Sequence, residues 1–258
     1  MNPFERHGVN WLSPSSLNLW QAEPSLWVMR YLFAMKDEMG PAARRGTAVE
    51  AGLDVHLIGG ATREEARNVA LQNFALNTDG LADDEHEAER NLIVPMVDQA
   101  CEAMPLDTVG RPVARQLKIE HRVPGIEVPI VGYVDYLWDD HGIDLKTTKR
   151  MPSQASADHL RQISIYSAAK SRPFKLLYVT DKKRMLYGAA PSDVEDALKD
   201  MERIARSLRK VLEKSDCREE VAEFFVPNRD SFRWNEATLK EVERVKSDHD
   251  NRSKMVSA

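Results

Sequence analysis

The stretch that decides the fold reads GYVDYLWDDHGIDLKT and covers residues 132–147. Polar and apolar side chains alternate in both halves, and a short polar break separates them, so we expect a β-hairpin. If the turn is centred on residues 139–140, Asp135 lies opposite Asp144, because paired positions in an antiparallel hairpin keep a constant sum. A turn centred on His141 would break this register, so the register is an assumption.

The predicted hairpin has two chemically different faces. Alternation with a period of two places Asp135, Asp144 and Lys146 on one face. The other face is apolar and can pack against a core; it carries Val134, Tyr136, Ile143 and Leu145. Two carboxylates directly opposite each other are about 5 Å apart and destabilise the pair unless a cation lies between them. A hard divalent metal ion would resolve the repulsion. The alternative is that both aspartates are ordinary polar residues on a solvated face.

The rest of the chain predicts further strands and helices around this hairpin. The alternating pattern begins upstream at Val113 and continues to Val134, which predicts antiparallel strands. Later strands are expected at residues 143–147, 174–180 and 185–189. Helical spacing of apolar residues predicts helices at residues 13–34, 42–57, 62–76, 83–103, 153–169, 192–212 and 236–247. The expected fold class is α/β (α+β), with a mixed central sheet flanked by helices.

Length and composition predict one soluble globular domain, residues 1–258, with a helical insertion at residues 62–103. Hydrophobic residues make up 42% of the chain and charged residues 30%, which is ordinary for such a protein. Two cysteines, Cys101 and Cys217, are too few for a disulfide framework and fit a reducing cytoplasm. No apolar run is long enough to span a membrane, and the first ten residues lack the apolar core of a secretion signal.

Charge is unevenly spread along the chain, although the net charge is −5. Residues 63–102 hold ten acidic and three basic residues, whereas residues 141–186 hold ten basic and three acidic ones. The second segment could form a local basic surface that contacts nucleic acid. The alternative is that both segments are solvated faces that happen to differ.

Two helical segments add polar residues at defined spacings. Glu50 lies four residues after Gly46 within a predicted helix. His159, Gln162 and Tyr166 fall on one face of the helix that follows the third strand. Taken singly, each of these residues is more commonly an ordinary polar residue on a helix surface, and their value lies in their combination with the hairpin.

Taken together, the four segments resemble the motifs of the RecB-like and lambda-exonuclease-like (YqaJ-type) branches of the PD-(D/E)XK nuclease superfamily. These motifs are a helical G-x-x-x-[E/H], then G-x-x-D, D-x-K and Q-x-x-x-Y. The sequence supplies them in this order at residues 46–50, 132–135, 144–146 and 162–166. The resemblance covers about half of the chain and implies a restriction-endonuclease-like core. Many RecB-type members carry His where Glu50 stands, so this chain looks closer to the lambda-exonuclease type.

The resemblance implies a role for each matching residue. The implied catalytic residues are Asp135, Asp144, Lys146 and Glu50. One or two Mg²⁺ or Mn²⁺ ions would be held by Glu50, Asp135, Asp144 and the backbone carbonyl of Leu145, a donor set of oxygens that suits hard ions. Lys146 would orient the attacking water or stabilise developing charge. The expected substrate-binding residues are Gln162, Tyr166, His159, Thr147, Thr148, Lys149 and Arg150, together with Ser13, Ser15, Arg44 and Arg45.

The expected function is that of a DNA exonuclease in recombination, repair or phage DNA metabolism, in the cytoplasm of a bacterial or phage-infected cell. The substrate would be a single strand or a duplex end, because the sequence shows no separate sequence-reading domain. Trp11, Trp20, Trp27 and Tyr31, with nearby arginines, could stack on an unpaired strand, although Trp20 and Trp27 at helical spacing fit a core better. The alternatives are a structure-specific or restriction-like endonuclease and a non-catalytic DNA-binding module.

Two further expectations concern cofactors and partners. The segment from Ser13 to Tyr31 looks like the N-terminal helix of RecB-type nucleases, in which a Cys-Pro pair often supplies an iron–sulfur ligand. Here that pair is Glu23-Pro24, so no iron–sulfur cluster is expected. A recombination protein or a single-strand-binding protein is an expected partner, which the sequence does not identify.

Overall fold

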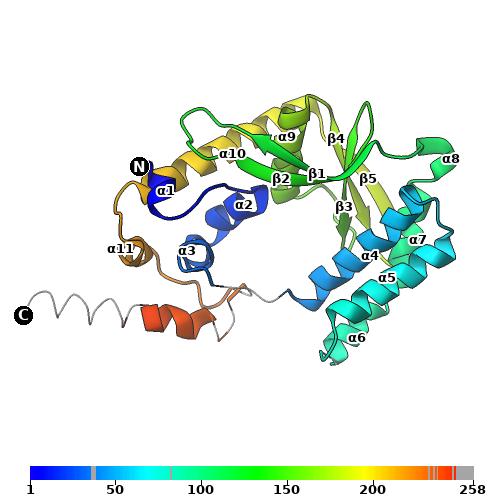
Figure 1. Ribbon diagram of the computed structural model, residues 1–258, viewed down its shortest axis with the longest axis horizontal. Helices are drawn as coiled ribbons and strands as arrows, with labels where there is room; N and C mark the ends of the chain where they lie inside the picture. The colour runs from blue at the N-terminus through cyan, green and yellow to red at the C-terminus, as the bar shows by residue number, and fades with distance from the viewer. Residues whose placement is uncertain are drawn as a thin grey trace, which may run out of the picture. The chain divides into compact units, whose positions relative to one another are not determined.

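The computed structural model describes residues 1–35, 39–81, 83–231, 233–234, 236, 238–245 and 247. The chain forms two compact units (Figure 1). Unit 1 comprises Met1–Asp37, Glu120–Val131 and Leu198–Ala258. Unit 2 comprises Glu38–Ile119 and Gly132–Ala197 and contains the predicted hairpin and all four motifs. The single-domain organisation with an insertion stays a prediction.

A mixed five-stranded sheet has the order β1-β2-β3-β4-β5. The strands are β1 (Ala114–His121), β2 (Ile130–Leu137), β3 (Gly142–Thr147), β4 (Phe174–Val179) and β5 (Arg184–Gly188). β2 and β3 are antiparallel, with Tyr136 paired to Ile143 and Leu137 to Gly142. This is the register of a turn centred on residues 139–140, so the hairpin prediction is confirmed. β3 pairs with β4 in parallel, and β4 pairs with β5 antiparallel, so the predicted mixed sheet is confirmed.

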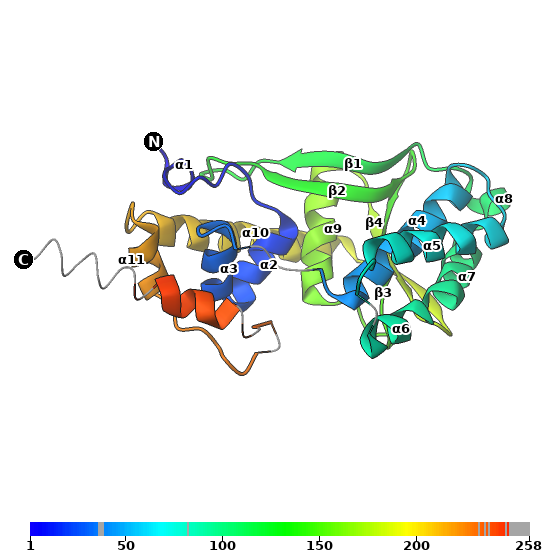
Figure 2. The same cartoon turned by 60° about the horizontal axis from the view of Figure 1, so that its bottom comes forward.

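The parallel pair β3–β4 requires a crossover connection, which helix α9 (Ala157–Lys170) supplies. Ser156 caps this helix, since its hydroxyl accepts a hydrogen bond from the His159 backbone N–H at 3.2 Å. The predicted helix began earlier, at residue 153, whereas the cap sets its true start. In Figure 2, α9 lies on one side of β3 and β4, and α4 to α7 lie on the other.

The other face of the sheet is covered by helices of unit 2. They are α4 (Pro41–Leu57), α5 (Arg63–Asn77), α6 (Asp84–Arg90), α7 (Ile93–Ala103) and α8 (Leu106–Val109). Tyr136, Ile143 and Leu145 of the hairpin share one hydrophobic core with apolar residues of α4, α5 and α7. The helices predicted within residues 62–103 are present, with a break between α6 and α7. They form a layer of the main core, so they are more than a surface addition.

Unit 1 contains α1 (Pro3–Arg6), α2 (Pro14–Ala22), α3 (Pro24–Tyr31), most of α10 (Pro191–Leu212) and α11 (Arg218–Glu223). The prediction of one helix over residues 13–34 is wrong. Pro24 lacks the N–H that would continue the first helix, and it begins α3 instead. The predicted serine cap is confirmed, because the Ser13 hydroxyl accepts from the Ser16 N–H at 3.0 Å. Residues 238–245 are helical, as predicted, whereas part of the expected 236–247 helix lies outside the described residues.

The core of unit 1 contains two of the tryptophans that the sequence offered for stacking. Trp20 and Trp27 are 5% and 0% exposed, and their rings meet edge to face at 5.5 Å between centroids. They are core residues, whereas Trp11 and Tyr31 remain 52% and 37% exposed. Glu23 is buried at the start of α3 and accepts a hydrogen bond from Trp234 Nε1 at 3.4 Å.

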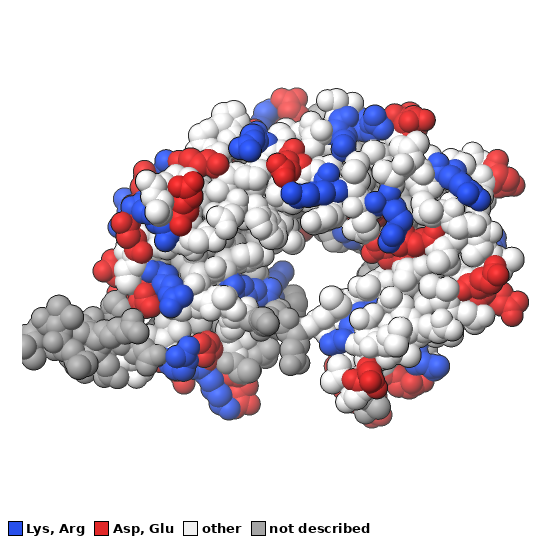
Figure 3. Space-filling view, in the orientation of Figure 1, with Lys and Arg blue, Asp and Glu red and all other residues white. Residues whose placement is uncertain are grey.

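In Figure 3, acidic and basic side chains are mixed on the visible surface of α4 to α7 in unit 2. Neither sign of charge dominates this surface. The acidic excess of residues 63–102 is therefore broken up on that face. Among the helices described, none is long and apolar enough to cross a membrane.

Candidate active site

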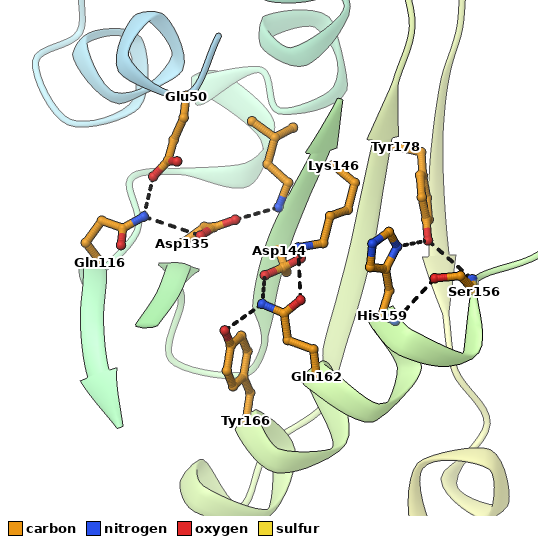
Figure 4. Close-up of polar contacts among 11 residues, drawn as sticks. Glu50, Gln116, Asp135, Asp144, Lys146, Ser156, His159, Gln162, Tyr166 and Tyr178 are labelled. Carbon is orange, nitrogen blue, oxygen red and sulfur yellow. Dashed lines mark hydrogen bonds and ion pairs between the residues drawn. The ribbon is translucent and has the colours of Figure 1, made fainter. Parts of the chain in front are cut away.

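The polar residues of the hairpin meet the polar face of α9 (Figure 4). Lys146 Nζ is 2.6 Å from Asp144 Oδ2 and donates to Gln162 Oε1 at 3.0 Å. Gln162 Nε2 in turn donates to Asp144 Oδ1 at 3.2 Å and to the Tyr166 hydroxyl at 2.7 Å. The third and fourth motifs are therefore linked by direct hydrogen bonds.

Asp135 joins the same group from β2. Its Oδ2 accepts a hydrogen bond from the Leu145 backbone N–H at 2.8 Å. Asp144 is 1% exposed, because α9 covers this face of the sheet. The alternative of a solvated sheet face therefore does not hold for Asp144. We call Glu50, Asp135, Asp144 and Lys146 the acidic cluster.

Glu50 reaches the cluster through a residue that the sequence analysis did not single out. Gln116 of β1 donates from Nε2 to Glu50 Oε1 and also to Asp135 Oδ1, the latter at 3.3 Å. One helical turn later, Asp54 has partners of its own: it accepts from the Tyr136 hydroxyl at 3.0 Å and forms an ion pair with Arg115, while its charge also acts on Glu50. Figure 4 shows Gln116 between Glu50 and Asp135.

The electrostatics of the cluster reflect crowded carboxylates. Burial raises the pKa of Asp135 well above its usual value, and the negative charges of Asp144 and Glu50 raise it further. Burial also raises the pKa of Glu50. For Lys146, burial lowers the pKa, but the attraction of Asp144 and Asp135 outweighs it, and the net shift is upward. The ammonium of Lys146 therefore stays protonated while it offsets only part of the negative charge.

Two motif glycines leave room for this arrangement. A Cβ at Gly132 would lie 2.6 Å from Tyr166 Cε1, too close for any other residue without a shift of the ring. The next backbone N–H, that of Tyr133, donates to the Tyr166 hydroxyl. A Cβ at Gly46 would lie 3.3 Å from Thr147 Oγ1. The glycines of the first two motifs thus let α4 and α9 approach the strands that carry the acids.

The donor set fits a hard divalent ion by its chemistry. It consists of oxygens, from the carboxylates of Glu50, Asp135 and Asp144 and from the carbonyl of Leu145. Among the residues that the structure describes, no three His, Cys, Asp or Glu side chains are gathered closely enough to hold an ion as they stand. Lys146 and Gln116 lie against the carboxylates instead.

His159 lies one turn before Gln162 but has a different partner. Its Nδ1 is 2.5 Å from the Tyr178 hydroxyl, which also accepts from the Ser156 backbone N–H at 3.4 Å. Tyr178 pairs with Lys146 across β3 and β4, so this group borders the acidic cluster. Burial lowers the pKa of His159 to about 4, and the charge of Lys146 contributes. The imidazole is therefore neutral at physiological pH.

The residues after β3 divide into exposed and buried ones. Lys149 and Arg150 are exposed, and the Thr148 hydroxyl donates to the Arg150 carbonyl at 3.0 Å. Arg45 is 3% exposed and forms an ion pair with buried Glu89, and Lys149 Nζ lies 2.5 Å from the same carboxylate. We call Arg45, Glu89 and Lys149 the Glu89 cluster. A buried, paired guanidinium is not available to a phosphate, so we do not carry forward the expected contact by Arg45.

The remaining expected phosphate contacts have other partners or belong to unit 1. Arg44 donates to the backbone carbonyls of Met39 and Asn77, the former at 2.8 Å. Thr147 accepts from Arg45 Nη2 at 3.4 Å. Ser13 and Ser15 belong to unit 1, where their hydroxyls lie 3.0 Å apart at the start of α2.

Three residues of this region escaped the sequence analysis. Gln116, Tyr178 and Glu89 meet their partners only through contacts between distant segments. Gln116 carried one usable signal, since it is polar in a strand that runs beside the hairpin. Tyr178 and Glu89 carried none: the first stands in a hydrophobic strand and the second in a run of acids.

Comparisons with known proteins agree with this geometry. The family model of the PD-(D/E)XK nuclease superfamily matches residues 11–251. A structure described as "Putative exonuclease" from Eubacterium rectale is similar at 10% identity and a TM-score of 0.56, covering 81% of this chain and 83% of that one. A structure named SSO0001 is similar at 14% identity and a TM-score of 0.32, covering 68% of this chain and 81% of that one. No curated protein matches.

The chain belongs to the PD-(D/E)XK nuclease superfamily, as its motifs predicted. Its mixed sheet with flanking helices is the fold that the Eubacterium rectale structure shares. Nucleases of this superfamily generally use divalent metal ions, which matches the oxygen donors of the acidic cluster.

Proposed function

We propose that this chain is a Mg²⁺- or Mn²⁺-dependent DNA exonuclease whose catalytic centre is the acidic cluster. The observation that carries the proposal is the excess of negative charge at the site: Lys146 pairs with buried Asp144, while the charges of Asp144 and Glu50 both act on Asp135. Such crowding is costly unless a cation compensates it. Glu50, Asp135, Asp144 and the Leu145 carbonyl are the proposed ligands.

In the proposed reaction, a bound divalent ion would polarise the scissile phosphate and lower the pKa of a water molecule from about 15.7 towards neutrality. Lys146 donates to the developing negative charge, and its pairing with Asp144 and Gln162 fixes its position. Gln162 is itself held by the Tyr166 hydroxyl. Gln162 and Tyr166 are therefore positioning residues for Lys146 and Asp144.

The proposed substrate contacts come from the exposed side of the same site. Lys149 and Arg150 follow β3 directly and are exposed, so they can meet phosphates of the strand being cut. Thr148 holds the turn that presents them. His159 is neutral and hydrogen-bonded to Tyr178, so it would contribute a polar contact without charge.

We prefer exonuclease activity over endonuclease activity for two reasons. The motif set resembles branches rich in end-processing enzymes, and the Eubacterium rectale structure that shares the fold carries an exonuclease description. We place the activity in recombination, repair or phage DNA metabolism, with a recombination or single-strand-binding protein as partner and the cytoplasm as location.

The test compares a linear single strand with a closed circle of the same sequence, each with Mg²⁺ and with EDTA. An exonuclease degrades the linear strand in Mg²⁺ and leaves the circle intact. Cutting of the circle would mean an endonuclease and would refute the end requirement. DNA binding without cleavage of either substrate, in Mg²⁺ and in Mn²⁺, would mean a non-catalytic module. A duplex with one labelled end, run in parallel, compares single and double strands.

A further inference from the structure

Gln116 occupies an unusual place between two carboxylates of the acidic cluster. Its Nε2 donates to Glu50 Oε1 and to Asp135 Oδ1, so one amide spans α4 and β2 (Figure 4). Ionised carboxylates only accept hydrogen bonds, so the NH₂ end of the amide must face them. A neutral donor thus stands at the point where the charges of Glu50 and Asp135 converge.

The backbone of Gln116 supports a functional reading. Its φ of 43° lies in the left-handed region, which residues other than glycine adopt rarely. Such conformations persist where surrounding structure over-determines them, and they gather at functional sites. Gln116 is also exposed, so burial in a core does not explain its conformation. The residue with this strained backbone is the one whose side chain contacts both carboxylates.

We infer that Gln116 is a further ligand of the divalent ion through its side-chain carbonyl Oε1. The inference rests on the proposed function, because it requires an ion at the acidic cluster. Glutamine carbonyls belong to the oxygen ligands that hard ions accept. The terminal torsion of a glutamine is broad and roughly twofold, so a half-turn of the amide exchanges NH₂ for oxygen without moving the backbone.

The contacts of Gln116 also explain how Glu50 belongs to the site. The three carboxylates are not gathered closely enough to share one ion as they stand. Gln116 touches both Glu50 and Asp135, so it keeps the acid of α4 beside the acids of the sheet. Without the ion, the Gln116 amide bridges Glu50 and Asp135 as a hydrogen-bond donor. With the ion bound, its side-chain carbonyl would add one oxygen ligand to those of the carboxylates.

The test measures Mn²⁺ affinity by isothermal titration calorimetry at neutral pH without DNA. Gln116→Ala should weaken Mn²⁺ binding about tenfold, near the lower end of the effect of losing a group that supports a metal site. Gln116→Glu should bind at least as tightly as the wild type, because it replaces one oxygen donor by another. Gln116→Asn tolerates the left-handed backbone but is one methylene shorter, so it should bind as weakly as the alanine variant.

The matched control is Gln72→Ala, which removes an exposed glutamine from α5 and should leave affinity unchanged. Wild-type affinity in both Gln116→Ala and Gln116→Asn, or tighter binding in either, would overturn the inference. So would a Gln116→Glu variant that binds Mn²⁺ as weakly as Gln116→Ala.

The variant Asp144→Asn distinguishes failure of the Gln116 inference from failure of the proposed metal site. If it loses Mn²⁺ binding while the Gln116 variants do not, only the role of Gln116 fails. If it binds like the wild type, the proposed metal site fails.

Discussion

The acidic cluster and the Glu89 cluster are both groups of charged side chains in unit 2 that contain a buried carboxylate, but their charges are balanced in opposite ways. In the Glu89 cluster, one carboxylate faces the guanidinium of Arg45 and the ammonium of Lys149. In the acidic cluster, the ammonium of Lys146 lies against Asp144 and near Asp135, and Glu50 adds a third negative charge beside Asp135. A buried charge is stable when it is paired. The protein's own side chains pair with Glu89, whereas in the acidic cluster the proposed metal ion would supply the missing positive charge.

The two clusters also differ in role: the Glu89 cluster is structural, and the acidic cluster is proposed to be chemical. Buried Glu89 ties α6 to α4 through buried Arg45, and to the segment after β3 through the exposed Lys149, a linkage that holds the fold together. In the acidic cluster, burial and the neighbouring carboxylates raise the pKa of Asp135, so ionisation there is opposed. A cluster whose only role was stability would not keep a carboxyl group whose ionisation is unfavourable. Removing a charge should therefore have different consequences in the two places.

The largest effect is expected for Lys146→Ala in the acidic cluster. The turnover rate should fall by about two to three orders of magnitude, because the charge of Lys146 is needed chiefly in the transition state. DNA affinity in Ca²⁺ should remain within a few fold of the wild type. Single-turnover cleavage rates and fluorescence anisotropy measure the two quantities. Equal losses in rate and affinity would assign Lys146 to ground-state phosphate binding instead.

In the Glu89 cluster, Glu89→Ala should lower stability by about 3–5 kcal/mol, because it leaves the buried guanidinium of Arg45 without its partner. Replacing both residues, as Arg45→Met with Glu89→Leu, should recover most of that loss. Urea denaturation of the three proteins measures it. An unchanged midpoint for Glu89→Ala, or a double variant no more stable than the single one, would show that the pair does not hold the fold.

Gly132→Ala tests the approach of α9 to the sheet. The new methyl group would clash with the Tyr166 ring, so stability should fall by about 1–3 kcal/mol. Gly188→Ala is the matched control, because it also lies in a strand and a Cβ there meets nothing within 4 Å. Thermal unfolding of both variants compares them. Equal shifts in melting temperature would show that the glycine of the second motif is not required by packing.

The smallest effect concerns His159, which borders the acidic cluster. Its pKa falls from 6.5 to about 4 in the folded state, chiefly through burial. A lowered pKa adds stability that is fully present above pH 6.5 and is lost as the pH falls towards 4. The melting-temperature difference between the wild type and His159→Gln should shrink by a few degrees over that range. A difference that stays constant from pH 7 to pH 4 would contradict the shift.

The sequence predicted the features that depend on local periodicity. Alternation in residues 132–147 gave the hairpin register and the separation of Asp144 from Ile143 and Leu145 onto opposite faces. The order and spacing of the four motifs predicted the superfamily to which the chain belongs. These succeeded because a period of two fixes the direction of each side chain once a strand is known.

The sequence could not supply contacts between distant segments. Arg44 and Arg45 are adjacent, and only the packing of α6 against α4 decides that Arg45 is the buried one. The helices of residues 62–103 were expected as an insertion, and their packing on the sheet depends on tertiary contacts that the sequence does not show. Gln116 joined the site for the same reason: its partners lie 66 and 19 residues away along the chain.

The most direct test of the central claim is Mg²⁺-dependent cleavage of end-labelled DNA by the wild type, Asp144→Asn and Glu89→Ala, at a temperature at which all three are folded. The wild type should cleave in Mg²⁺ and stop in EDTA. Asp144→Asn should be slower by at least about a hundredfold, because losing a ligand costs no less than losing its supporting groups. Glu89→Ala should stay within a few fold of the wild-type rate per folded molecule, because Glu89 holds Lys149, a proposed phosphate contact, and is no proposed metal ligand. A folded Asp144→Asn protein that cuts at the wild-type rate would contradict the account.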